Sequence, residues 1–318
     1  MTEKQINKWL RRRFTVIGWV LIGYYGLINL LVMVTMSLDM AKQTLWNLAA
    51  GDFFGNFDMD AVMANGWGYI TACIVLMLIL AAWQGREFWQ QEVFAKSRKM
   101  TVPVFLAMIS LCIGSQLVSN LWLWLLEVCM NLMGRSMLDV LETVSGSTDS
   151  FSMFLYASIL APVTEELVFR GYVIRSLRPY GKRFAILFSA LMFGLFHGNL
   201  MQAPYAFLVG LLLGYLALEY SVVWACVLHV FNNLVLAEGL GRLTAGMSEM
   251  MAGVVHISLF ALFAVVSVGI LISKRHQIAD FRQSEWVDRR CVKCLLTSGG
   301  IIALFLMMAG NMLTMLFI

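Results

Sequence analysis

The residues best suited to chemistry are a few ionisable side chains that lie within long apolar runs. Placing such a group inside a membrane is costly, so each one is by default a candidate for function. Two amides, Asn232 and Asn233, lie close to one of the histidines and add hydrogen-bonding groups to the set. The ionisable candidates are Glu127, Glu165, Glu166, Arg170, His197, Glu219, His229 and His256.

The densest group runs from Thr164 to Arg170, where an apolar run meets a basic loop. Glu166 precedes Arg170 by four residues, which is the favoured order for an ion pair on one helix face. Glu165 is rotated about 100° from Glu166 at 3.6 residues per turn, so it lacks that partner. Two adjacent carboxylates in different surroundings can take different parts in acid–base catalysis. The spacing predicts a structural Glu166 and a reactive Glu165. The structural alternative is a charge pair that anchors the end of a span.

Two histidines supply the remaining chemistry, each from its own apolar run. His197 follows Phe193 by four residues, and His229 precedes Asn233 by four, so each pair shares a helix face. A carboxylate and an imidazole can orient and deprotonate a water molecule. A second imidazole and an amide can donate hydrogen bonds to a developing oxyanion. The set Glu165, His197, His229 and Asn233 therefore suits hydrolysis.

Two other interpretations of the histidines compete with hydrolysis. An intramembrane histidine can be a structural group that is hydrogen-bonded to a neighbouring helix. Alternatively, both histidines and Glu165 could ligate Zn²⁺, with water in the fourth position. The H-E-x-x-H helix of a zincin is absent from the sequence. We expect no cofactor, with Zn²⁺ as the alternative that stays open.

The elements that carry these residues are predicted to be membrane-spanning helices. The chain of 318 residues is 60% hydrophobic and 13% charged, whereas a soluble domain is about half apolar and about a quarter charged. A span needs about 20 mostly apolar residues. The fold expected is an all-α polytopic bundle of eight or nine spans. Candidate spans lie near 14–36, 67–83, 103–133, 151–169, 184–202, 203–219, 222–237, 252–273 and 295–318.

Basic residues alternate between loops in a way that predicts the orientation of the chain. The N-terminal segment and the loops 84–102, 171–183 and 274–293 are rich in Lys and Arg, whereas the loops between them are not. Under the positive-inside rule the N-terminus is cytoplasmic. The basic residues form no stripe interleaved with aromatics, so nucleic-acid binding is not expected. Segment 40–66 could be an outer loop or a re-entrant amphipathic piece.

Three motifs in this order resemble the CAAX-protease-and-bacteriocin-processing family, abbreviated CPBP and also called Abi. They are Glu-Glu-x-x-x-Arg at 165–170, Phe-x-x-x-His at 193–197 and His-x-x-x-Asn at 229–233. The resemblance covers residues 151–237 and implies a four-helix catalytic core. Residues 1–150, with about three spans, and 238–318 carry no such motif, so they are expected to be an N-terminal region of unknown role and C-terminal spans.

The resemblance implies a role for each motif residue. Glu165 and His197 would activate the water, and His229 and Asn233 would form the oxyanion hole. The supporting residues would be Glu166, Arg170 and Phe193. The family has been described both as metalloproteases and as metal-independent glutamate proteases, and the metal-independent mechanism is the one we favour here.

The function expected is that of an intramembrane endopeptidase in a bacterial cell membrane. Its substrate would be a prenylated or otherwise lipidated protein, or a secreted peptide precursor, and it could serve peptide maturation or bacteriocin self-immunity. These substrates rest on family analogy. Two alternatives are a non-enzymatic membrane scaffold or immunity partner, and a transporter whose acids and histidines relay protons or ions.

Two further features carry weaker expectations. Cys291 and Cys294 form a single C-x-x-C, which is half of a zinc site, so a structural role is expected. Gly210 and Gly214 form a G-x-x-x-G pair that favours close helix contact.

Overall fold

The protein is a bundle of helices, described here from a computed structural model. The structure describes residues 2–52, 55, 57–95, 97–136, 150–283 and 288–315, and within these ranges no strand occurs. The all-α prediction is confirmed. Much of the predicted loop 134–150 and part of the loop 274–293 lie outside the described residues.

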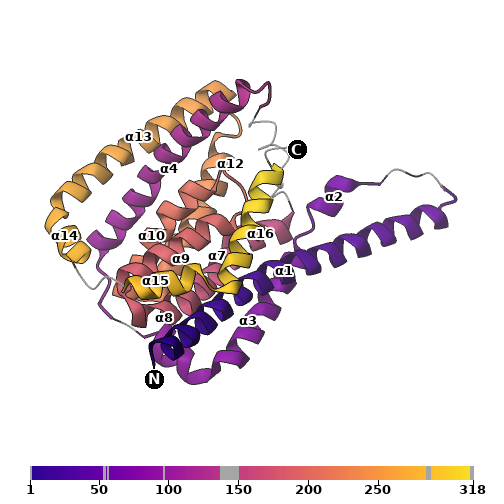
Figure 1. Cartoon of the computed structure of the whole chain (residues 1–318). Helices are drawn as coiled ribbons and strands as arrows, with labels where there is room; N and C mark the ends of the chain where they lie inside the picture. Colours follow the sequence, from indigo (N-terminus) through magenta and orange to yellow (C-terminus); the bar gives the residue numbers. More distant parts are fainter. Residues whose placement is uncertain are drawn as a thin grey trace.

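Three groups of helices lie side by side across the bundle (Figure 1). At one edge α4 (Val102–Asn131) pairs with α13 (Glu249–Ser273), and α14 (Arg275–Gln283) follows α13. At the other edge α1 (Glu3–Ala49) packs against α3 (Trp67–Glu87) and α16 (Gly299–Met315). The centre holds α9 (Lys182–Phe196) and α10 (Ala203–Glu219) together with the two helices that carry the Glu165 and His229 motifs.

The Glu165 motif lies on a continuous helical stretch, Phe151–Tyr180, that changes its winding several times. It comprises α6 (Phe151–Leu155), η2 (Tyr156–Leu160), α7 (Ala161–Glu166), η3 (Leu167–Val173), α8 (Ile174–Leu177) and η4 (Arg178–Tyr180). The His229 motif lies on α11 (Val222–Phe231), which continues into η5 (Asn232–Gly239) and α12 (Leu240–Thr244). The segments η2, η3 and η5 are π-helical, a winding found frequently at functional sites.

Six helices in the described part of the chain are long and apolar enough to cross a membrane. A seventh is added if α15 (Arg289–Leu296) and α16, bent by 61°, count as one span. The expected number of eight or nine included α9 and α10 as full spans. These helices have 15 and 17 residues, or about 22 and 25 Å at 1.5 Å per residue, which is short of a hydrocarbon layer of about 30 Å.

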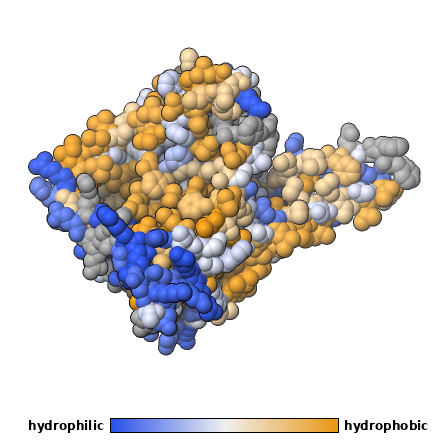
Figure 2. All heavy atoms as spheres, in the orientation of Figure 1, coloured by the Kyte–Doolittle hydropathy of each residue, from blue (hydrophilic) through white to orange (hydrophobic). Residues whose placement is uncertain are grey.

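The surface agrees with a membrane environment. Figure 2 shows apolar residues over most of the visible face, with hydrophilic residues gathered near the start of α1. The large exposed apolar side chains include Leu262 and Val265 on α13 and Leu106 and Leu121 on α4. The edge helices therefore present apolar side chains outward, as lipid contact requires.

Helix α1 extends far past the predicted span 14–36. Its 47 residues correspond to about 70 Å. The segment beyond residue 36 contains neither Gly nor Pro before Gly51, so nothing in it stops the helix. The short helix α2 (Met59–Met63) then follows. Segment 40–66 is thus largely the helical end of α1 and α2, with both Gln43–Asp58 hydrogen bonds joining them.

Candidate active site

Glu166 and Arg170 form a fully buried ion pair in the middle of the bundle. Arg170 Nη1 lies 2.9 Å from Glu166 Oε1, and both side chains are 0% exposed. Arg170 Nη2 donates to the carbonyl of Gly210 at 3.3 Å, and the guanidinium lies 4.3 Å from the centre of the Phe193 ring. The ion pair predicted from the four-residue spacing is present, and it connects the Glu165 helix to α9 and α10.

This ion pair leaves polar atoms without aligned hydrogen bonds. Glu166 Oε2 and Arg170 Nε and Nη1 are buried and have no hydrogen-bond partner among the described atoms. Arg170 Nη1 is therefore held by charge attraction rather than by an aligned hydrogen bond. Buried charges cost free energy unless a partner compensates them, so each member of the pair depends on the other.

His229 connects Glu166 to Glu165. His229 Nδ1 lies 2.9 Å from Glu166 Oε1, and His229 Nε2 lies 3.8 Å from Glu165 Oε2. The buried carboxylate of Glu166 accepts a hydrogen bond from His229 Nδ1–H, and this bond fixes the orientation of the ring. The other ring nitrogen then points toward Glu165.

Glu165 occupies a more open position than its neighbour. Its side chain is 18% exposed, against 0% for Glu166. Tyr24, Tyr156 and Cys73 interact with it electrostatically. The sequence predicted that Glu165 would lack the Arg170 partner, and its nearest ionic neighbour is indeed His229. Glu165 is thus the carboxylate of the pair that water can reach.

His197 lies at the end of α9, where Gly198 takes a left-handed conformation (φ 69°) and ends the helix. His197 Nδ1 lies 2.9 Å from the carbonyl oxygen of Phe193, so Nδ1 is the donor and Nε2 is left as an acceptor. The Phe193 ring makes edge contacts with both imidazoles, with ring centres 4.9 Å from His197 and 5.5 Å from His229. Phe193 therefore packs between the two histidines.

Asn233 is oriented by a chain of polar groups that the sequence analysis did not identify. Its Nδ2 donates to the carbonyl of Ala157 in η2 at 2.9 Å. Its Oδ1 accepts from Asn232 Nδ2 at 3.0 Å. The Oδ1 of Asn232 in turn accepts from the Tyr205 hydroxyl and, at 3.4 Å, from the Cys112 thiol. The sequence signals that could have indicated this chain were Tyr205, whose hydroxyl lies in an apolar run, and Asn232, which is next to Asn233.

The remaining candidates lie apart from this network. Glu219 is buried and pairs with Arg98 at 3.4 Å and with Lys182. His256 Nε2 lies 3.1 Å from the Thr244 hydroxyl. Glu127 interacts with Ser136. These residues act in local contacts.

The C-x-x-C motif and the other candidate metal ligands form no cluster in the described part of the chain. Cys291 and Cys294 are free thiols, and Cys294 contacts Asn7. Across the described ranges, no three His, Cys, Asp or Glu side chains converge closely enough to hold a metal ion.

The G-x-x-x-G prediction is confirmed. A Cβ on Gly210 would lie 3.1 Å from the Cα of Ala190, and one on Gly214 would lie 3.1 Å from the Ile186 side chain. The absence of both side chains brings α10 against α9. This close approach also lets the Gly210 carbonyl reach Arg170.

Comparison with known proteins identifies the part of the chain that holds this site. Residues 147–235 match the family model described as Type II CAAX prenyl endopeptidase Rce1-like. No curated protein and no solved structure gives a significant match. The matched segment includes all three motifs, and the family supports intramembrane endopeptidase activity in general. Residues 147–235 thus resemble an Rce1-like type II CAAX prenyl endopeptidase domain, consistent with the CPBP family, within a multi-pass integral membrane protein.

Proposed function

We propose that this protein hydrolyses a peptide bond of a membrane-associated substrate, using Glu165 as the general base. The observation that carries the proposal is the asymmetry of the two carboxylates. Glu166 is buried and committed to Arg170 and His229, whereas Glu165 is partly exposed and faces His229 Nε2 at 3.8 Å. This difference between the two carboxylates supports Glu165 as the group that receives a proton from water.

The first step is attack of water on the carbonyl carbon of the scissile bond. Glu165 accepts one water proton as the new C–O bond forms, and His197 assists through Nε2, which its Phe193 contact leaves as an acceptor. A correctly placed base contributes about 10²–10⁴-fold to such a step. The product of this step is a tetrahedral intermediate with a negative oxygen.

His229 and Asn233 stabilise that oxygen. Because His229 Nδ1–H is committed to Glu166, Nε2 donates to the oxygen only when the ring carries a proton on both nitrogens, and the Glu166 carboxylate then supplies the counter-charge. Asn233 uses one Nδ2 proton on Ala157 and retains the second. Donors fixed in advance stabilise a developing oxyanion strongly. The C–N bond then breaks, and the proton held by Glu165 passes to the leaving amine.

The substrate proposed is a peptide with a lipidated or hydrophobic segment. The family name refers to prenylated CAAX substrates, and the site lies within apolar helices. Peptide maturation and bacteriocin self-immunity are the biological roles that we consider. The mechanism uses residues of this chain and includes no metal step.

Cleavage of fluorogenic peptides by the purified protein in lipid tests this function. Prenylated and unprenylated peptides would be compared for the wild type, Glu165→Gln and His197→Ala, each with and without a zinc chelator. Glu249→Gln and His276→Ala are matched controls, since both residues are exposed and lie outside the network. We expect Glu165→Gln to lose about 10²–10⁴-fold in kcat with unchanged folding. Normal turnover by Glu165→Gln would contradict the assignment.

A further inference from the structure

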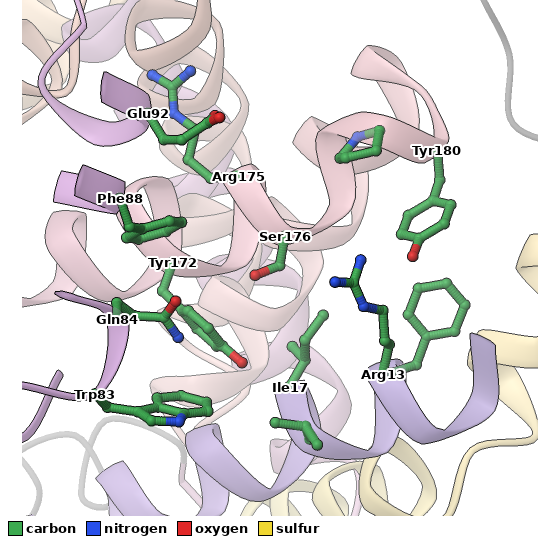
Figure 3. Close-up of a pocket in the computed structure, with 13 residues that line it drawn as sticks. Arg13, Ile17, Trp83, Gln84, Phe88, Glu92, Tyr172, Arg175, Ser176 and Tyr180 are labelled. Carbon is green, nitrogen blue, oxygen red and sulfur yellow. The ribbon is translucent and has the colours of Figure 1, made fainter. Parts of the chain in front are cut away.

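A cavity of about 420 Å³ lies at the basic end of the bundle, between α1, α3 and the helix that carries the active site. Figure 3 shows its walls, which combine aromatic rings with polar tips. Trp83 and Phe88 cover one side, and Ile17 lies on the other. The cavity is on the face of η3 and α8 that turns toward α1 and α3, and none of the residues in the proposed mechanism lines it.

Hydrogen-bond donors gather at one end of the cavity. The Arg13 guanidinium lies near the hydroxyls of Ser176 and Tyr180 in Figure 3. The Tyr180 hydroxyl is buried and has no hydrogen-bond partner among the described atoms. An unpaired buried hydroxyl costs about 1–3 kcal/mol. Beside a guanidinium, the group that would satisfy it is an acceptor with a negative charge.

The other charges around the cavity favour that same end. Arg175 is buried, donates from Nη2 to the carbonyl of Ala217 at 3.0 Å, and interacts electrostatically with Glu92. These two residues lie together at the opposite end of the view from Arg13 (Figure 3). Glu92 balances Arg175 and would repel an anion there. The net positive charge is left at Arg13.

The cavity opens toward lipid and is closed toward the active site. Val16 and Trp83, which line it, are 38% and 51% exposed on the outer surface of the bundle. One turn further toward Glu165, each wall is sealed by a side chain that is at most 2% exposed. These side chains are Leu21, Leu80 and Val168. A ligand can thus enter from the membrane boundary, whereas a peptide in the cavity could not extend to Glu165.

We propose that this cavity binds the phosphate-bearing headgroup of an anionic phospholipid. Arg13, Ser176 and Tyr180 donate to the phosphate oxygens, and the acyl chains run past Val16 and Trp83 into the bilayer. Charge-assisted hydrogen bonds to phosphate are short and strong, and basic residues next to a span attract anionic lipids. The bound headgroup joins α1 to α8, which directly continues the helix of Glu165 and Arg170.

Thermal unfolding of the full chain in neutral detergent tests the proposal. The protein would be titrated with short-chain phosphatidylglycerol, short-chain phosphatidylcholine or free glycerol 3-phosphate. We expect phosphatidylglycerol to raise Tm at concentrations where the other two have little effect. Arg13→Gln should weaken its apparent affinity about tenfold, and Tyr180→Phe, which changes no charge, several-fold. Arg12→Gln is the matched control, since Arg12 is exposed, adjacent and absent from the cavity lining.

Four results would overturn the proposal. If phosphatidylglycerol stabilised the protein no more than phosphatidylcholine does, the cavity would not be a site for an anionic phospholipid. Equal stabilisation by glycerol 3-phosphate would indicate a site for soluble phosphate. If Arg12→Gln and Arg13→Gln weakened the apparent affinity for phosphatidylglycerol equally, the binding would be due to diffuse surface charge and not to the cavity. Displacement of the lipid by a short peptide with a free C-terminal carboxylate, and not by its amide, would assign the cavity to a peptide end. Each of these results is independent of whether the protein cleaves peptides.

Discussion

The helical stretch Phe151–Tyr180 and helix α13 show opposite relations between hydropathy and burial. Among the six span candidates in the described chain, Phe151–Tyr180 is the least apolar and α13 the most apolar. In their most apolar windows, 44% of the residues of the first are buried, but only 11% of those of α13. Lipid is as apolar as a protein core, so burial within a membrane follows polar groups and close packing. The least hydrophobic of these six candidates is therefore the one that carries Glu165 and Glu166 of the candidate site.

The same two regions differ in backbone winding. Phe151–Tyr180 contains the π-helical segments η2 and η3, whereas α13 is α-helical from Glu249 to Ser273. The Ala157 carbonyl of η2 accepts the Asn233 amide, so irregular winding is used to join two helices of the site. In α13 the winding is regular, and its outer face presents exposed apolar side chains such as Leu262 and Val265.

The largest effect on stability is expected from the buried ion pair. Arg170→Met should lower the free energy of unfolding by about 3–5 kcal/mol, because it leaves Glu166 buried without its guanidinium. Arg242→Met is the matched control, since Glu238 and Arg242 form a pair of the same four-residue spacing with Arg242 64% exposed. That change should cost about 0–1 kcal/mol. Equal losses in detergent unfolding would show that burial does not distinguish the two pairs.

A smaller effect is expected from the polar chain behind Asn233. Tyr205→Phe removes the hydroxyl that donates to Asn232 and should lower kcat about tenfold, the scale of one hydrogen bond at about 1–1.5 kcal/mol. KM should change little, because Tyr205 acts on the orientation of Asn233. Tyr215→Phe, ten residues along the same helix, is the control. A change in KM alone would assign Tyr205 to substrate binding.

Packing between α4 and α13 provides a test at the edge of the bundle. A Cβ on Gly114 would lie 2.5 Å from the Ser267 hydroxyl and 2.8 Å from the Phe263 carbonyl oxygen. Gly114→Ala should thus cost about 1–3 kcal/mol without changing cleavage per folded molecule. Gly23→Ala, with no atom within 4 Å of its added Cβ, should be neutral or stabilising. A loss of activity at unchanged stability would extend the functional region to the edge helices.

The smallest effect is expected on the lipid-facing side of α13. Val265 is 72% exposed, so Val265→Ala should change the free energy of unfolding by less than about 0.5 kcal/mol. Leu213→Ala, at a site that is 0% exposed, should cost about 2–5 kcal/mol. The free energies of unfolding of the two variants would be measured in the same lipid mixture. A large cost at Val265 would mean that another protein surface covers α13.

Local features of the site could be predicted from the sequence, and distant ones could not. The Glu166–Arg170 pair follows from helical spacing alone. The contact of His229 with Glu166 joins residues 63 positions apart and depends on how α11 packs against α7. Tyr205 and Cys112 were missed because they carry no charge. The roles of Glu165, His197, His229 and Asn233 remain predictions that rest on the motifs.

Hydropathy predicted the existence of the helices better than their lengths. The boundary between the predicted spans 203–219 and 222–237 agrees with the end of α10 at Glu219 and the start of α11 at Val222. The apolar run ending near residue 36 marked the change in hydropathy, but α1 continues to Ala49 because helix formation does not require an apolar sequence. For α9 and α10, an apolar run is equally compatible with lipid contact and with enclosure by other helices. No residue of α10 is exposed, whereas α9 exposes Leu187 and Leu191.

The contact between α1 and α16 has a consequence for how the chain is made. A Cβ on Gly18 would lie 2.2 Å from the backbone of Gly300, and one on Gly300 would lie 2.1 Å from the Thr15 carbonyl oxygen. Asn311 also donates to the Tyr25 hydroxyl at 2.9 Å. Helix α1 is thus completed by contacts that join residues up to 286 positions apart. During synthesis the Gly18 face of α1 lacks this partner until α16 has been made, so a chain that stops before α16 would leave that face uncovered.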